Sequence, residues 1–186
     1  LYSDPKKTLV FLDNHDLPRW FARIRSKAKL KQALAVMLTA PRIPQIYYGT
    51  EFLFDGDGCG KGDGNYRVDA FEVLSTSNKI ADNEMAQYLR NILSWRKTSQ
   101  AISHGSMKHF IPQNGVYVYF RSYKKEEKVM VLVNNTSKVS KIDMSLYQEE
   151  FRGYKYGTDI ITKKEINLEN HLLSMQKNGV FILELF

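Results

Sequence analysis

The chain has 186 residues, of which 43% are hydrophobic and 25% charged, which suits one large globular domain or two small ones. Its 12% of aromatic residues argues against a chain that stays unfolded in water. The formal net charge is +7, but the basic residues are scattered and no nucleic-acid-binding motif accompanies them. We therefore expect no nucleic-acid partner.

The single cysteine, Cys59, excludes an internal disulfide and a cysteine-based metal cluster. No apolar run approaches the roughly 18 residues that crossing a bilayer requires, so we expect no membrane partner. The first ten residues also lack the basic start and the apolar stretch of a signal peptide.

The first part of the chain predicts a strand, a helix and a second strand. The apolar run Leu9–Leu12 is typical of a buried parallel strand that ends in a polar loop. Apolar residues then recur at spacings of three and four from Leu30 to Leu38, which predicts an amphipathic helix that ends before Pro41. A second strand is expected over Ile43–Tyr48. This order predicts a βαβ unit with two parallel strands.

A polar loop is expected next, because residues 55–65 are rich in glycine and aspartate and polar sequence continues to about Asn83. Asp55, Asp57 and Asp63 leave a calcium loop as an alternative, although the EF-hand pattern is absent. Otherwise we expect neither a metal nor a cofactor. The apolar positions of residues 85–95 predict a second helix, with Asp82 or Asn83 as its N-cap.

From about Ile102 the pattern changes to strands and turns. Strands are expected at residues 109–112, 115–123, 128–134, 138–144 and 180–186. Asn114-Gly115 is a strong hairpin signal, since both residues tolerate positive φ. In the following strand Val116, Val118 and Phe120 form an aliphatic face, and the alternate residues Tyr117, Tyr119 and Arg121 form an amphipathic one. Short strands at this spacing predict an antiparallel sandwich or barrel, and of the two we expect a Greek-key β-sandwich over residues 102–186, after a first domain over residues 1–101.

The polar cluster Asp13-Asn14-His15-Asp16 follows the first strand, where α/β enzymes place their chemistry. Residue types alone do not decide between a functional site and a set of loop-stabilising side chains. Tyr47 and Tyr48 are more typical of packing than of ligand binding. The overlapping N-x-[ST] sequons at residues 134–137 are explained by a turn after a strand.

Two ordered motifs together resemble the α-amylase family of glycoside hydrolases. FLDNHDLPRW at residues 11–20 and IPQIYYGTE at residues 43–51 resemble the family segments that end strands seven and eight of a TIM (β/α)8 barrel. Within that family the motifs most resemble those of the neopullulanase and cyclomaltodextrinase branch. That branch also carries a GDG loop and an Arg-x-Asp pair, here Arg67 to Asp69. The resemblance extends into the strand-rich region and implies the last two βα units of such a barrel, followed by the C-terminal β-sandwich.

The resemblance implies that His15 and Asp16 are catalytic residues at the sugar whose bond is cleaved, with Asp16 stabilising the distorted transition state. It further implies substrate binding by Arg67 and Asp69 at more distant sugars, by Tyr48 or Trp20 through stacking, and by the neighbouring Arg19. The segment RVDAFEV at residues 67–73 departs from the family pattern R-x-DFPGGW.

The parent protein is therefore expected to be a retaining glycoside hydrolase that cleaves α-1,4 bonds of starch-like glucans or maltooligosaccharides. The family's nucleophile and general acid belong to motifs that precede FLDNHD, so we expect the segment alone to be inactive. A non-catalytic carbohydrate-binding or structural module is the alternative. We also expect homodimerisation through the open barrel edge. The resemblance favours a periplasmic or secreted location, with the cytoplasm as alternative.

Overall fold

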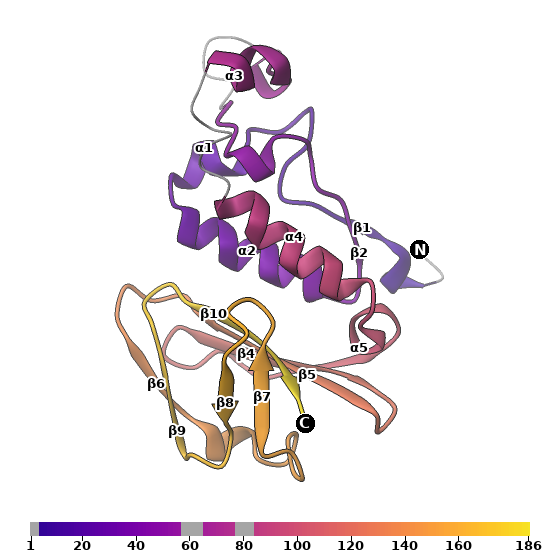
Figure 1. Cartoon of the computed structure of the whole chain (residues 1–186), viewed down its shortest axis with the longest axis vertical. Coiled ribbons are helices and arrows are strands. Elements are labelled where there is room, and N and C mark those ends of the chain that lie inside the picture. Colours follow the sequence, from indigo (N-terminus) through magenta and orange to yellow (C-terminus); the bar gives the residue numbers. More distant parts are fainter. Residues whose placement is uncertain (1–3, 57–64, 77–83) are drawn as a thin grey trace. The chain divides into compact units, whose positions relative to one another are not determined.

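The computed structural model describes residues 4–56, 65–76 and 84–186 (Figure 1). The chain forms two compact units, residues 1–38 with 42–90 and residues 39–41 with 91–186, which are described separately. The domain limits predicted from sequence, 1–101 and 102–186, stay a prediction. Several residues named above lie outside the described ranges: Asp57, Cys59, Asp63, Asp82 and Asn83.

The first unit contains the expected strand, helix and strand. Its elements are η1 (Pro5–Lys7), β1 (Leu9–Val10), α1 (Trp20–Ile24), α2 (Lys27–Thr39), β2 (Ile43–Pro44), η2 (Thr50–Phe52), α3 (Ala70–Thr76) and α4 (Glu84–Arg96). The last residue of α2 and residues 91–96 of α4 already belong to the second unit. Strands β1 and β2 pair in parallel, with Leu9 opposite Ile43 and Val10 opposite Pro44, which confirms the predicted orientation. A closed eight-stranded barrel stays a prediction.

Both strands are shorter than the predicted Leu9–Leu12 and Ile43–Tyr48. Each has a single neighbour in the structure, and Pro44 has no N–H to donate to a ladder. One further hydrogen bond, from Gln45 N to Val10 O at 2.8 Å, ends the pairing before the chain turns. Leu9 and Ile43 are therefore exposed, at 59% and 47%.

The predicted helices are confirmed as α2 and α4. Leu30, Leu34 and Leu38 are buried, which confirms the apolar stripe of α2. Within the first unit Tyr88 Oη of α4 donates to Lys31 O of α2 at 2.8 Å. Three short helices were not predicted: α1, α3 and α5 (Gln100–Ser103). Helix α3 lies in the stretch expected to be loop, and its seven residues make only about two turns, too few for a helical periodicity to stand out in the sequence.

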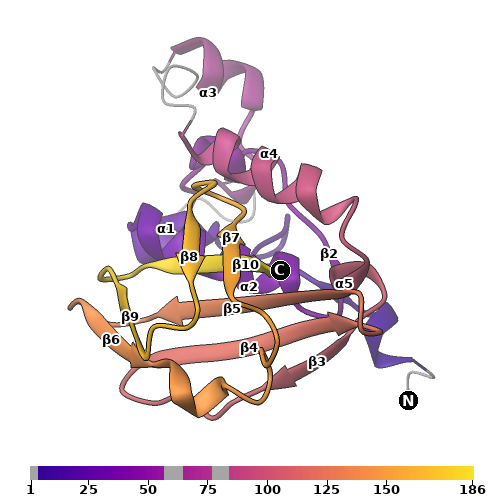
Figure 2. The ribbon, with the colours of Figure 1, turned by 60° about the horizontal axis from the view of Figure 1, so that its bottom comes forward.

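The second unit is built on antiparallel strands, as predicted. They are β3 (Ser106–His109), β4 (Val116–Tyr123), β5 (Glu127–Asn134), β6 (Ser140–Asp143), β7 (Tyr156–Asp159), β8 (Glu165–Asn167), β9 (Leu172–Met175) and β10 (Val180–Leu185). Six strands form one sheet in the order β3-β4-β5-β10-β7-β8, and β6 pairs with β9 (Figure 2). The long pairing of β4 with β5 joins Val116 to Asn134 at one end and Tyr123 to Glu127 at the other.

Four predicted strands agree with β4, β5, β6 and β10 within a few residues. The strand expected at residues 109–112 instead lies at Ser106–His109, because Pro112 cannot donate to a ladder and the chain turns at Asn114 and Gly115, with φ of 50° and 75°. The turn confirms the predicted hairpin. Strands β7, β8 and β9 were missed, since they have three or four residues each and little alternation.

Side chains of both sheets form one hydrophobic core in the second unit. It joins the aliphatic face of β4 with residues of β5, β6, β9, β10 and η5 (Met144–Tyr147): Val116, Val118, Phe120, Met130, Leu132, Ile142, Met144, Tyr147, Phe151, Leu168, Met175, Leu183 and Leu185. The opposite face of β4 was expected to be amphipathic, yet Tyr119 and Arg121 are 0% and 1% exposed. They are buried because Thr39, Ile102 and Gly105 supply hydrogen-bonding partners within this unit.

Candidate functional site

The polar cluster after β1 begins with a buried carboxylate. Asp13 is 3% exposed, and its Oδ2 accepts a hydrogen bond from the N–H of Trp20 at 2.8 Å, at the first residue of α1. The same oxygen lies 3.6 Å from Nε of Arg19. Asp13 therefore satisfies a helix terminus and a buried cation, which is a structural role.

Arg19 is fully buried and connects the segments that follow the two strands. Its Nη2 donates to Tyr48 O at 2.5 Å, and its guanidinium carbon lies 4.4 Å from the centre of the Tyr47 ring. Its backbone N–H donates to Gly56 O at 2.8 Å. Nε and Nη1 donate no hydrogen bond among the described residues. In this position Arg19 orders the neighbouring loops rather than facing solvent.

The next side chains of the motif are exposed and meet an arginine from a distant segment. Asp16 Oδ2 lies 3.1 Å from His15 Nε2, and its Oδ1 accepts from Arg67 Nη2 at 3.0 Å. Nε of Arg67 also donates to His15 O at 3.1 Å. The side chains of His15, Asp16 and Arg67 are 59%, 60% and 49% exposed. We call these three residues the His15–Asp16–Arg67 cluster.

An exposed aromatic side chain belongs to the same unit. Tyr48 is 40% exposed, and its ring packs edge-on against the Tyr47 ring, with 4.6 Å between centres. Its hydroxyl donates to Val68 O at 2.8 Å, next to Arg67 in the chain. Burial raises the pKa of the Tyr47 phenol above its ordinary value of 10.0, and the hydrogen bond with Tyr48 raises it further. Trp20 is half-buried, and its Nε1 donates no hydrogen bond among the described residues.

Asp69 has a local partner that sequence reasoning did not identify. Its Oδ1 accepts from the N–H groups of Phe71 and Glu72 at 2.8 and 3.2 Å, so it caps the first turn of α3. Both hydrogen bonds use the same carboxylate oxygen.

Asp55, one of the calcium candidates, pairs with Arg25 at 2.9 Å. In the described parts of the chain no three His, Cys, Asp or Glu side chains are grouped to hold a metal ion. None of the helices described combines the length and apolar character that crossing a membrane requires.

The fold thus brings His15, Asp16 and Arg67 into contact and joins Arg19 to Tyr48 O. The cluster presents a carboxylate, an imidazole and a guanidinium to solvent, a set that can exchange several hydrogen bonds with a polyhydroxyl ligand. The contact of Arg67 with Asp16 spans 51 residues of sequence. No local pattern could have indicated it, nor the packing of Tyr47 against Arg19.

Comparisons with known proteins show which protein families this chain resembles. Residues 107–184 match the family model described as the cyclo-malto-dextrinase C-terminal domain. The chain is 31% identical to a cyclomaltodextrin glucanotransferase of Niallia circulans over 136 aligned residues. These residues cover 73% of this chain and 18% of that protein. An α-amylase of Niallia circulans is 31% identical over 136 residues, covering 72% of this chain and 24% of that protein. The chain thus spans less than a quarter of the length of these relatives.

A solved structure shows the same fold over nearly the whole chain. An α-amylase from Anoxybacillus superposes with a TM-score of 0.79 and 26% sequence identity, covering 99% of this chain and 39% of that protein. The similarity therefore includes both compact units and is not confined to the strand-rich one.

Proposed function

We propose that this chain, a C-terminal segment of the α-amylase type, supplies the sugar-distorting part of the active site in a retaining glycoside hydrolase. The substrates that we propose are starch-like glucans and maltooligosaccharides with α-1,4 bonds. The observation that carries the proposal is the exposed His15–Asp16–Arg67 cluster directly after β1, held by contacts of 3.0 and 3.1 Å.

The chemistry of glycoside cleavage gives this cluster its role. The oxocarbenium-like transition state flattens the sugar ring and moves its hydroxyl groups. A fixed carboxylate can then accept better hydrogen bonds from the distorted ring than from the relaxed one, which lowers the barrier. Arg67 restrains the Asp16 carboxylate, and its bond to His15 O restrains the backbone beside it. The cluster is therefore ordered before the sugar arrives.

The other predicted residues take two kinds of role in this proposal. Arg19 acts through position, because its buried guanidinium holds the carbonyl of Tyr48. Tyr48 offers a partly exposed ring on which a sugar face can stack. Trp20 is proposed to contribute its half-buried ring in the same way. Asp69 keeps its Oδ2 for a sugar hydroxyl while Oδ1 caps α3.

The bond-breaking groups are proposed to lie in other segments of the parent protein. Retaining cleavage needs a nucleophile and a general acid about 5 to 5.5 Å apart. The resemblance assigns both to motifs that do not occur in this sequence. We therefore expect no turnover of a chromogenic maltooligosaccharide by the 186-residue chain. Turnover that Asp16→Asn abolishes would contradict this division of roles.

The decisive experiment uses Asp16→Asn in the protein that contains this segment. We expect kcat/KM for a chromogenic maltooligosaccharide to fall by about 10²–10³, with KM changing much less, because the lost contact strengthens in the transition state. Unfolding should change little, since the ion pair with Arg67 is exposed. Asp143→Asn, an exposed carboxylate of the second unit, is the matched control and should leave kcat/KM unchanged. Equal activity of both variants would refute the role of Asp16.

A further inference from the structure

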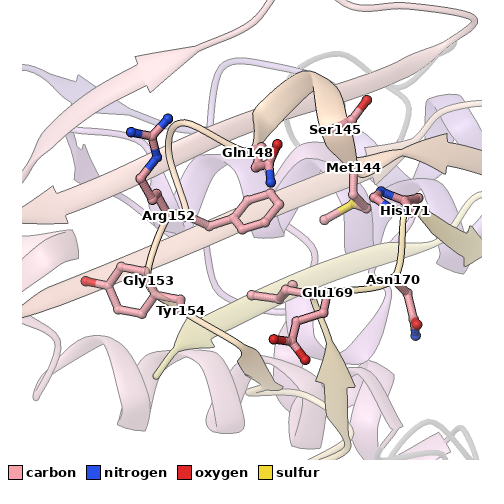
Figure 3. Close-up of a pocket in the computed structure, with 11 residues that line it drawn as sticks. Met144, Ser145, Gln148, Arg152, Gly153, Tyr154, Glu169, Asn170 and His171 are labelled. Carbon is pink, nitrogen blue, oxygen red and sulfur yellow. The ribbon is translucent and has the colours of Figure 1, made fainter.

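A cavity of about 230 Å³ lies within the second unit, in a part of the fold that the proposed active site does not use (Figure 3). Met144 and Gln148 line it from η5 and the turn that follows. Glu169, Asn170 and His171 line it from the segment between β8 and β9. The Met144 N–H donates to His171 O at 2.9 Å, which ties the two walls together.

The floor and the rim of this cavity differ in chemistry. Its floor is formed by Met144, Phe151 and Leu168, which are buried members of the hydrophobic core. Its rim carries the exposed polar side chains of Gln148 and Asn170. An apolar surface with a few polar groups around it is the usual composition of a small-molecule site.

The polar rim has hydrogen-bonding capacity that the protein does not use. The side chains of Gln148 and Asn170 form no hydrogen bond with other residues that the structure describes, and each amide can both donate and accept. The charged side chains on the rim are of both signs, Arg152 and Glu169. Glu169 also lies 3.7 Å from Lys155. Because the rim does not carry charge of a single sign, it is not built for an anion or a cation, and a neutral ligand suits it better.

We propose that this cavity binds one glucose unit of an α-glucan. A sugar ring combines an apolar face, which fits the floor, with hydroxyl groups, which fit the neutral amides of Gln148 and Asn170. At about 230 Å³ the cavity is smaller than the roughly 300–1,000 Å³ of drug-sized sites, so it suits a single ring. The choice of an α-glucan rests on the proposed function. The choice of a neutral sugar rests on the cavity alone.

The test is an NMR titration of the ¹⁵N-labelled 186-residue chain with maltotriose, with cellobiose in parallel. We expect maltotriose to shift the side-chain amide signals of Gln148 and Asn170, with a dissociation constant on the order of 1 mM because the contact area is small. Replacing both residues with alanine should weaken binding about tenfold or more. Because both side chains are exposed, the variant should keep its fold.

Two controls separate this site from others. Gln113→Ala removes an exposed amide at a second cavity of the same unit, of about 290 Å³, and should leave the affinity unchanged. Asp16→Asn alters the proposed active site and should not change the shifts at Gln148. If Asp16→Asn abolished maltotriose binding and the Gln148→Ala/Asn170→Ala variant kept it, the cavity site would be overturned and the proposed function would be supported. Absence of maltotriose binding, or binding of cellobiose with the same affinity, would overturn the α-glucan site. The proposed function is tested separately, by kcat/KM of the Asp16→Asn variant.

Discussion

Replacing Arg121 with methionine should strongly destabilise the second unit. Arg121 is a buried cation, and none of the described carboxylates forms an ion pair with it. Burial lowers the pKa of its guanidinium to about 10, so it stays charged at neutral pH. Its partners are backbone carbonyls: Thr39 at 2.5 Å, Ile102 at 2.9 Å, Gly105 at 3.0 Å and Ser106 at 3.2 Å.

The magnitude follows from what these carbonyls would lose. Thr39 is the last residue of α2, Ile102 lies in the last turn of α5, and Gly105 follows that helix. Backbone carbonyls at the C-terminal end of a helix have no hydrogen-bond donor within the helix. Each buried acceptor left without a donor costs about 1 kcal/mol or more. Removing the desolvated charge offsets part of that cost. We therefore expect the free energy of unfolding to fall by about 3 kcal/mol.

Urea unfolding followed by circular dichroism would measure this loss. Arg152→Met, at an exposed arginine of the same unit, is the matched control and should change the free energy of unfolding by less than about 0.5 kcal/mol. A loss below about 1 kcal/mol for Arg121→Met would refute the reasoning, because it would mean that water or relaxed backbone satisfies the carbonyls at little cost.

Three further predictions follow from local geometry. Gly115→Ala should lower the free energy of unfolding by about 1–2 kcal/mol, because φ is +75° and the added Cβ would lie 2.5 Å from Cγ2 of Thr136. An unchanged midpoint of urea unfolding would contradict this. The hydrogen bond from Lys108 holds the pKa of the Glu150 carboxyl below its ordinary value of 4.5. The stability that this carboxylate confers is therefore present above pH 4.5 and is lost as the pH falls through the folded-state pKa. Glu150→Gln should reduce the loss of melting temperature at acidic pH. Exposed Leu9 and Ile43 should make the isolated chain self-associate, and replacing both with lysine should yield a monomer by light scattering, whereas a wild-type monomer at high concentration would refute the dimer proposal.

Much of the secondary structure was predictable because its determinants are local. The stripe from Leu30 to Leu38 is a property of helical periodicity, and it is buried in α2 as expected. Asn114-Gly115 adopts the positive φ angles that its residue types favour. By contrast, β8 (Glu165–Asn167) forms because β7 lies beside it, not because its three residues favour a strand.

The polar face of β4 shows the limit of pattern reading. Tyr119 and Arg121 alternate with apolar residues, which is equally typical of a solvated face. Their polar groups can be buried because they are hydrogen-bonded. One of the partners, Thr39, is 80 and 82 residues distant in the chain. A sequence pattern indicates which residues share a face, but it does not say what covers that face.

In the candidate site, too, some features were predicted from the sequence and others were decided only by the tertiary structure. The resemblance to a family motif led to the prediction that His15 and Asp16 are site residues, because a motif is a short run of adjacent residues that can be recognised without the fold. Only the folded chain placed Arg67 on Asp16, buried Arg19 completely and used Asp69 to cap a helix. Each of these outcomes depends on contacts between separate segments or on the supply of backbone donors. For Arg67 and Arg19 the partners are 51 and 29 residues away in the chain, so neither periodicity nor residue type indicates them. The cap by Asp69 is local, but it depends on whether a helix begins at Ala70, which the sequence did not predict.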